Sequence, residues 1–444
     1  MNSSVGDLFG GSARKIRDEV WGDIPVNRAM RTLLETKAMQ RLKGMRKLGF
    51  VTGAFPAARH SRLDHALGVY YLTGITLKRI TDSGAYLEER ETQSALAAAL
   101  LLDIGRYPYA EAVEDIALPE IIGQKELSRR WIEDSEVARV LKSEWDVEPH
   151  NVSRLVTRDN DLPIALTPTE HLTRDILFGS LDISTLDSLI RDAKGTKVSF
   201  GLLNLDGLME NLRIVGQENR ALLAVDEDGA GALQAYVFSR YLMYYNVYGH
   251  YAMRIPHTMF ARAVQDSVQD NIVSFDRLAE EDDAGAFALV QDSAPRESAP
   301  AILTRRLAER RPYLRALELD YRHHSYTSLI RLRTDASWRR RVEEAWSRYL
   351  TRYRKGVAGP FDILIDIPRP RTPQVDLQYI RRMPLPGERN LTDWEGLSGM
   401  HPGLTEELSL PLHRRIRVMA ADQELAQSVR RHAEELFTIA KEVG

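Results

Sequence analysis

The sequence predicts a mainly α-helical body followed by a smaller α+β region toward the C-terminus. Two stretches have helical character over many residues, the Ala- and Leu-rich run Glu91–Asp103 and the aromatic run Ala232–Val268. In the last part of the chain, Phe361–Pro368 is typical of a strand that stops at a proline. A composition of 43% hydrophobic and 28% charged residues indicates an ordered globular protein with a large core.

The N-terminal part of the chain is predicted to form a hairpin and then a series of helices. Residues 1–13 are small and Gly-rich and are expected to be a loose end. A turn signal at Gly22-Asp23 predicts a short hairpin or turn within Lys15–Val26. Helices are then expected over Asn27–Glu35 and Ala38–Leu48, from Arg59 onward, over Glu126–Trp145 and over His171–Ile176, with a loop at Gly49–Phe55.

The remaining elements lead to three predicted regions. These are a helical domain over residues 1–278, an acidic and then Ser/Pro-rich loop over 279–300, and a helical and α+β region over 301–444. The aromatic helix is expected to break or kink at Pro256. The further expectations are strands, or a strand and a short helix, over Phe200–Leu212 and Ile214–Val225, a helix over Ile302–Arg354, a strand over Arg415–Ala420 and a final helix over Gln423–Glu442.

Charge and cysteine usage exclude several classes of function. The formal net charge is −3, which gives no bulk electrostatic case for nucleic acid or an anionic membrane as a partner. Cysteine is absent, which excludes disulfides, thiolate nucleophiles and Cys–zinc sites. No segment approaches the ~20 apolar residues of a membrane helix, and the N-terminus lacks a signal pattern. We therefore expect a soluble cytoplasmic protein.

One acid stands at the end of an otherwise apolar helical run. The stretch Ala98–Glu114 reaches Asp103, turns at Gly105, crosses Pro108 and resumes as a helix. A carboxylate there is costly to bury unless it is paired, hydrogen-bonded or bound to a metal. Asp103 is therefore either a structural acid that caps or bridges, or part of a site.

Three stretches, one after another along the chain, help to decide whether Asp103 is structural or part of a site. They are Gln40–Gly49 continued by Phe55-Pro56 and His60–Val69, then the stretch around Asp103, and then Leu181–Asp192. Together they resemble the HD-domain phosphohydrolases, specifically their dNTP triphosphohydrolase branch. The aromatic run Ser239–His250 and the tail strand Asp362–Pro370 are similar to further parts of that family. The resemblance implies an HD-type helical body and self-association into a dimer or tetramer.

The resemblance also implies a divalent metal site, and this sequence departs from it. Such enzymes hold a metal with two His and two Asp, and the metal activates water for attack on a phosphate ester. By register, His65 and Asp103 remain, whereas Leu102 and Ser184 stand where a His and an Asp are expected. A bound Mg, Mn, Fe, Ni or Zn ion is expected only if the remnant pair functions. Arg106 and Glu111 take the places of histidines that assist catalysis, and Lys125 replaces a third with a less certain register.

Residues that contact the nucleotide in the family are better preserved. The resemblance assigns phosphate contacts to Arg62 and Arg240, sugar contacts to Tyr248 and Asp192, and the base slot to Leu48 beside Lys47. Each has a structural alternative: His65 as a buried hydrogen-bonded histidine, the arginines as core ion pairs, Tyr248 as part of a packed aromatic stripe, and Asp192 as a surface acid.

Three functions remain open from the sequence. The leading one is a catalytically inactive HD-domain protein that binds a dNTP or NTP and acts as a regulator or scaffold, with an active HD paralogue or another protein as partner. The second is a surviving phosphohydrolase that uses His65 and Asp103 with Glu111, Glu114 or Asp182. The third is nucleic-acid binding through the Arg-rich region 304–354, which the near-neutral composition disfavours.

Overall fold

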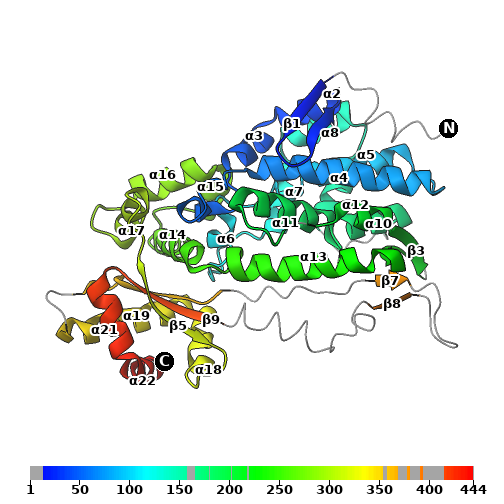
Figure 1. Ribbon diagram of the computed structural model, residues 1–444. Helices are drawn as coiled ribbons and strands as arrows, with labels where there is room; N and C mark the ends of the chain where they lie inside the picture. The colour runs from blue at the N-terminus through cyan, green and yellow to red at the C-terminus, as the bar shows by residue number, and fades with distance from the viewer. Residues whose placement is uncertain are drawn as a thin grey trace.

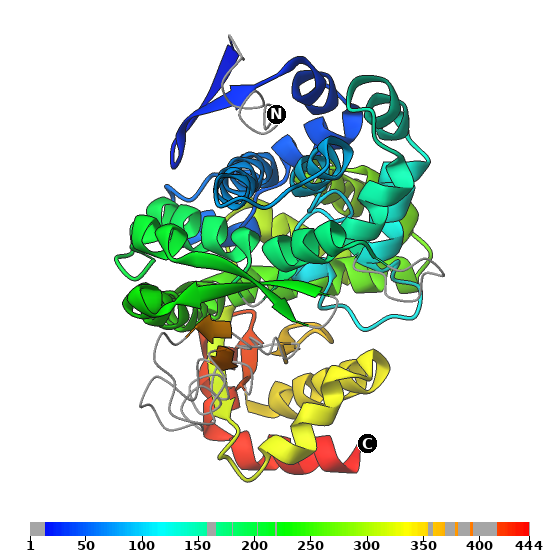
Figure 2. The same cartoon turned by 90° about the vertical axis from the view of Figure 1, so that its right-hand side faces the viewer.

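The protein is a mainly α-helical molecule with a small C-terminal α/β unit, as the sequence predicts. In the computed structural model, the described residues are 14–157, 166–179, 181–201, 203–217, 220–353, 358–368, 378–380, 391–393 and 415–443. The helical body forms one half of the molecule, and the C-terminal unit lies beneath α13 and α14 (Figures 1 and 2). The predicted loose end at 1–13 falls outside the described residues.

The helical body starts with a hairpin and continues through short and long helices. Strands β1 (Arg14–Asp18) and β2 (Gly22–Val26) pair antiparallel, which confirms the predicted hairpin. The helices that follow are α2 (Arg28–Leu34), α3 (Lys37–Gly44), η1 (Gly49–Gly53), α4 (Arg62–Asp82), α5 (Glu89–Leu100), α6 (Ala110–Val113), α7 (Gln124–Glu133), α8 (Glu136–Glu144), α9 (Pro149–Thr157), α10 (Pro168–Phe178), α11 (Ile183–Thr196) and α12 (Leu205–Glu210).

Helix α4 and the turn after α5 form the centre of this body. Ser61 caps α4 by accepting from the Asp64 backbone N–H, and the Asp64 carboxylate accepts from the Ser61 backbone N–H. This capping box fixes the first turn of α4, which carries Arg62 and His65. Helix α5 is Ala-rich because its residues 95–100 are packed on all sides, and Asp103 follows directly after it.

The aromatic stretch forms two helices, and the predicted break is wrong in its position. Helix α13 (Ala230–Met243) runs into a π-helical turn, η3 (Tyr244–Tyr248), and α14 (Tyr251–Gln269) begins after Gly249. Pro256 is the sixth residue of α14 and lacks the N–H that would bond to the Ala252 carbonyl, yet the helix continues through it to Gln269. The chain therefore turns at Gly249, beside the cavity described below.

The predicted loop at 279–300 is also wrong. Helices α15 (Phe275–Glu280), α16 (Asp283–Ser293) and α17 (Ala299–Ala308) occupy this stretch. Asp282 caps α16, and the buried Ala286 and Val290, one helical turn apart, attach it to the core. Charge and proline content suggested a loop, but caps and apolar spacing decided the structure.

Two further sheets complete the fold. Strands β3 (Leu212–Gln217) and β4 (Arg220–Asp226), joined by η2 (Glu227–Gly229) to α13, form a sheet with β7 (Gln378–Ile380) and β8 (Leu391–Asp393). The C-terminal sheet has the order β5 (Leu314–Asp320), β9 (Arg415–Ala420), β6 (Ile363–Asp366). Helices α19 (Ala336–Leu350) and α21 (Gln423–Arg431) pack against it, and α18 (Tyr326–Leu329), η4 (Ile330–Arg333), η5 (Thr351–Tyr353) and α22 (Ala433–Glu442) complete this unit.

These elements correct the remaining secondary-structure predictions. The strand over Arg415–Ala420 is confirmed, but the expected helix Ile302–Arg354 is interrupted by β5, and the final helix is divided at His432. One hydrophobic cluster joins the two parts of the molecule, because Leu364 and Met419 of the C-terminal sheet pack with Phe260 of α14. No helix in the described part of the chain is both long and apolar enough to cross a membrane.

Candidate functional site

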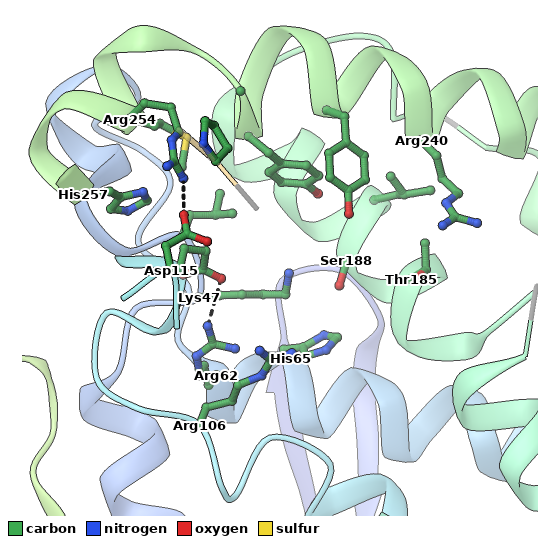
Figure 3. Close-up of a pocket in the computed structure, with 18 of the residues that line it drawn as sticks. Lys47, Arg62, His65, Arg106, Asp115, Thr185, Ser188, Arg240, Arg254 and His257 are labelled. Carbon is green, nitrogen blue, oxygen red and sulfur yellow. Dashed lines mark hydrogen bonds and ion pairs between the residues drawn. The ribbon is translucent and has the colours of Figure 1, made fainter. Parts of the chain in front are cut away.

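A cavity of about 280 Å³ lies between α4, α11, η3 and the start of α14. Arg62 and His65 approach it from α4, Arg240 and Arg254 from the opposite side, and Lys47 reaches across the middle (Figure 3). The cavity also has Pro368 and Arg417 of the C-terminal unit in its wall. It therefore brings together most of the residues that the sequence singled out, and it touches both parts of the molecule.

His65 is held at both ring nitrogens. Its Nδ1 lies 2.7 Å from Asp187 Oδ2, and its Nε2 lies 3.2 Å from Ser184 Oγ. Burial raises the pKa of Asp187, but the charges of Arg191 and the hydrogen bond from His65 outweigh it and lower the pKa to about 2. Asp187 also accepts from Trp21 Nε1 at 2.6 Å, so a charged network fixes the ring orientation.

Two guanidinium groups lie against Asp103. Arg62 Nη1 donates to Oδ2 at 2.8 Å, and Arg106 Nε lies 3.4 Å from Oδ1. The same arginines reach one acid each beyond Asp103, with Arg62 Nη2 3.0 Å from Glu111 and Arg106 Nη1 2.5 Å from Glu114. Burial opposes ionisation of Asp103, but the arginine charges outweigh it and hold its pKa well below the usual range.

These contacts do not fit a metal site. Zinc usually takes at least three protein ligands, whereas His65 and Asp103 supply two, and both nitrogens of His65 and both oxygens of Asp103 already contact protein groups. Ser184 lines the cavity and bonds to His65, and Leu102 is buried in the hydrophobic core. In the described part of the chain, three His, Asp or Glu side chains with ligand atoms within 4.8 Å of one another meet only at His323, His324 and Glu434, outside this cavity.

Asp192 lies behind the cavity and is fully buried. Its carboxylate accepts from Tyr248 Oη at 2.6 Å, from Lys47 Nζ at 3.1 Å and bonds to His60 Nε2 at 2.7 Å. Burial opposes its ionisation, but Lys47 and the hydrogen bonds hold its pKa well below the usual range. Asp192 does not line the cavity, so Lys47 and Tyr248 are the groups of this cluster that face it.

Arg240 and Leu48 are the remaining residues that the sequence predicts to contact a nucleotide. The Arg240 guanidinium lies over the Tyr236 ring at 5.5 Å, and its Nε is buried without a hydrogen-bond partner among the described residues. Leu48 is buried and forms part of the wall next to Lys47. The role of each as a nucleotide contact stays a prediction.

The charges of the cavity are arranged in two layers. Six cations line it (Lys47, Arg62, Arg106, Arg240, Arg254 and Arg417), against three carboxylates (Asp103, Glu111 and Asp115). Further acids form ion pairs with these cations from behind the lining. Asp192 pairs with Lys47 and Glu114 with Arg106. Asp366 pairs with both Arg254 and Arg417. The inner surface is therefore cationic, while the acids behind it hold the cations in place.

Sequence reasoning missed several residues of this site. Asp187 could have been found from its i,i+4 spacing to Arg191 within the third motif. Arg254, Asp115 and Arg417 carried no local signal, because they meet only when α6 and the C-terminal sheet pack against α14. His257 also lines the cavity, and burial lowers its pKa to about 4, so its ring is neutral at neutral pH.

Comparisons with known proteins agree with this fold. Residues 204–381 match the family model described as the HD associated region. The uncharacterized protein MJ1154 of Methanocaldococcus jannaschii is 23% identical over 279 residues, which cover 63% of this chain and 55% of that protein. A deoxynucleoside triphosphate triphosphohydrolase SAMHD1 homolog of Dictyostelium discoideum is 26% identical over 193 residues, 41% of this chain and 36% of that one.

A solved structure extends the similarity to nearly the whole chain. The crystal structure of a hypothetical protein from Aquifex aeolicus has a TM-score of 0.66 and 22% identity, and covers 96% of this chain and 99% of that one. At this identity the likeness shows the fold. The chain spans about half the length of the first curated relatives that it matches, 55% and 52%. By the family model and these relatives, the chain is similar to HD-domain proteins and, at low identity, to deoxynucleoside triphosphate triphosphohydrolases.

Proposed function

We propose that this protein is a catalytically inactive HD-domain protein that binds a nucleoside triphosphate without a metal and acts as a regulator or scaffold. The observation that carries the proposal is the pair of guanidinium groups on Asp103. They supply positive charge next to the acid that the family uses for its metal. Unlike a metal ion, a guanidinium group does not coordinate the oxygen of a water and does not turn it into a hydroxide nucleophile at neutral pH.

The other candidate acids are also engaged. Glu111 and Glu114 form ion pairs with Arg62 and Arg106, and Asp182 caps α11 by accepting from Thr185. Arg106 stays protonated at neutral pH and is a poor general acid. A hydrolytic reaction in this cavity would therefore have to break at least one of these pairs first.

The cationic lining supports an anionic ligand. Guanidinium groups bind phosphate oxygens through two parallel hydrogen bonds, and Arg62 and Arg240 lie on opposite walls of the cavity (Figure 3). The rings of Tyr244 and Tyr248 provide flat apolar surface beside them. A triphosphate on the arginines and a nucleoside on the tyrosines would use both features.

The test is binding and turnover measured on one sample. We expect dATP, dGTP or ATP to bind in calorimetry, with no release of phosphate or triphosphate in Mg²⁺, Mn²⁺, Fe²⁺, Ni²⁺ or Zn²⁺. Replacing Arg240 by Ala should weaken binding about tenfold or more, because a charged contact to phosphate is lost. The matched control is Arg28→Ala, which removes an exposed arginine paired with Glu144 and should leave affinity unchanged.

Two results would decide against parts of this proposal. If none of the nucleotides tested binds, the nucleotide-binding part of the proposal is wrong and only the scaffold role is left. Metal-dependent turnover that disappears in Asp103→Ala would establish the surviving phosphohydrolase instead.

A further inference from the structure

Two adjacent histidines and one glutamate meet at the surface of the C-terminal unit. His323 and His324 lie in the turn between β5 and α18, and Glu434 lies in the first turn of α22. His324 and Glu434 are 110 residues apart in sequence, and they come together because α18 packs beside α22. One nitrogen of each histidine and one carboxylate oxygen of Glu434 all lie within 4.8 Å of one another.

The contact between His324 and Glu434 already has the spacing of two ligands on one metal ion. His324 Nε2 lies 3.2 Å from Glu434 Oε2. Zinc bonds to histidine nitrogen and carboxylate oxygen at ~2.0–2.2 Å, so two ligands of a tetrahedral zinc ion stand roughly 3.3–3.5 Å apart. The side chains of His324 and Glu434 are 64% and 67% exposed, so an ion from the solvent reaches both.

His323 is the most firmly held of the three side chains. It is half-buried, its ring lies edge-on to Phe437 at 5.4 Å, and its Nδ1 accepts from the Ser325 backbone N–H at 3.2 Å. The His324 ring stacks on it at 4.4 Å. Coordination therefore requires the exposed His324 ring to rotate out of this stack. Binding through His323 Nε2 also moves the ring proton to Nδ1 and gives up one long hydrogen bond.

Glu434 differs from the acid of the first cavity in its partners. There, in the cavity that we call the HD cavity, Asp103 is paired with Arg62 and Arg106. The Glu434 carboxylate contacts His324 and forms no ion pair with a lysine or arginine among the described residues. A metal ion therefore binds Glu434 without displacing a guanidinium or ammonium group of the described chain.

We propose that His323, His324 and Glu434 bind a zinc ion, which joins the turn after β5 to α22. Two imidazole nitrogens and one carboxylate oxygen are ligands that suit zinc, and water takes the fourth position. None of the three side chains lines the HD cavity, so the inference is independent of nucleotide binding there. A site with three protein ligands, two of them exposed, exchanges its ion with the buffer and is measured by titration.

The experiment titrates Zn²⁺ into the full chain, after chelator treatment and desalting, in competition with a chromophoric chelator. We compare wild type with His324→Ala and with Glu434→Gln, each of which removes one ligand. The matched control is His150→Ala, because His150 is an exposed histidine that pairs with a single acid of the described chain, Glu133, at 3.7 Å. A second control, His65→Ala, removes the histidine of the HD cavity.

We expect one zinc ion per wild-type chain, and an affinity about tenfold or more lower in His324→Ala and Glu434→Gln. The affinity should be unchanged in His150→Ala and His65→Ala. Because zinc binds the folded C-terminal unit, it should also raise the melting temperature of wild type more than that of the two ligand variants. Melting curves recorded without zinc show whether each variant is folded.

Three results would overturn the proposal. The first is equal zinc affinity in wild type and in both ligand variants, which would mean that zinc is an adventitious ion only. The second is the absence of saturable zinc binding to wild type. The third is loss of the bound ion in His65→Ala, which would place it in the HD cavity.

Discussion

Two cavities of similar volume differ in the way that their polar groups are paired. The HD cavity is the one around Arg62 and Asp103, and the C-terminal cavity, of about 320 Å³, is lined by Thr327, Ser328, Leu329, Arg331, Trp338, Ala440 and Lys441. In the HD cavity Arg62, Arg106 and Lys47 each contact a carboxylate of the protein. In the C-terminal cavity Arg331, Trp338 and Lys441 have no such partner among the described residues. Charges that are paired inside the protein stabilise the fold and must be displaced by a ligand, whereas unpaired donors contribute little to the fold. The first cavity should thus tolerate mutation poorly, and the second well.

The largest expected effect is the removal of Asp103. Asp103→Ala removes the acid that the buried Arg62 and the half-buried Arg106 share, so that only Glu111 and Glu114 still pair with them. Breaking a buried pair costs up to ~3–5 kcal/mol. The matched control is Glu126→Ala, whose exposed pairs with Arg129 and Arg130 should contribute no more than about 1 kcal/mol. Urea denaturation measures both, and equal losses would contradict the contrast between paired and exposed charges.

The second expected effect is acid sensitivity of the HD cavity. Asp103, Asp187 and Asp192 have pKa values that the neighbouring cations lower. Their stabilising effect is therefore complete above the unfolded pKa of ~3.9 and is lost as the pH falls below it toward the folded values. Asp187→Asn should reduce the slope of unfolding free energy against pH below ~4 by up to about 1.4 kcal/mol per pH unit. Denaturant unfolding from pH 5 to 2 tests this, and an unchanged slope would mean that Asp187 is not held ionised.

A third expected effect concerns the cap of α4. Ser61→Ala removes the acceptor for the Asp64 backbone N–H and should cost about 1 kcal/mol. Because this cap fixes the turn that carries Arg62 and His65, nucleotide affinity should fall together with stability. Thermal melting and calorimetry on Ser61→Ala and Ser61→Thr check it, and Ser61→Thr should retain most of both properties.

The smallest expected effect is in the C-terminal cavity. Arg331→Gln and Lys441→Gln remove cations with no partner in the described part of the chain, so each should change the free energy of unfolding by less than about 0.5 kcal/mol. Urea denaturation in phosphate-free buffer measures this. A loss of several kcal/mol would show that these side chains are structural and would weaken the contrast between the cavities.

The sequence predicted those features that depend on local pattern. The hairpin at β1 and β2, the strand Arg415–Ala420 and the apolar helix before Asp103 follow from turn residues, alternation and composition. The prediction of a loop over residues 279–300 was wrong because it treated acids and prolines as loop signals. Asp282 and Ser298 in fact stand at the N-terminal caps of two helices there. Caps and loops share the same residue types, so composition alone does not separate them.

The sequence singled out part of the lining of this cavity but not how its polar groups pair. The resemblance to the family assigned Arg62, His65, Asp103 and Ser184 to one site. All four residues line the cavity. That Arg62 would lie on Asp103, 41 residues away in sequence, depends on how α4 packs beside the turn after α5. The C-terminal cavity was unpredictable for the same reason, since its walls come from four elements between Thr327 and Lys441.

Whether the cavity around Asp103 works without a metal is tested by the metal content of the full chain purified without chelators. Mass spectrometry is applied to wild type and to Leu102→His/Ser184→Asp, which restores the two missing ligand types, and triphosphate release is assayed on the same samples. We expect no stoichiometric metal and no triphosphate release for wild type, and a higher metal content in the restored variant. A stoichiometric transition metal in wild type, lost in His65→Ala, would contradict it and make a metal-dependent phosphohydrolase the better description.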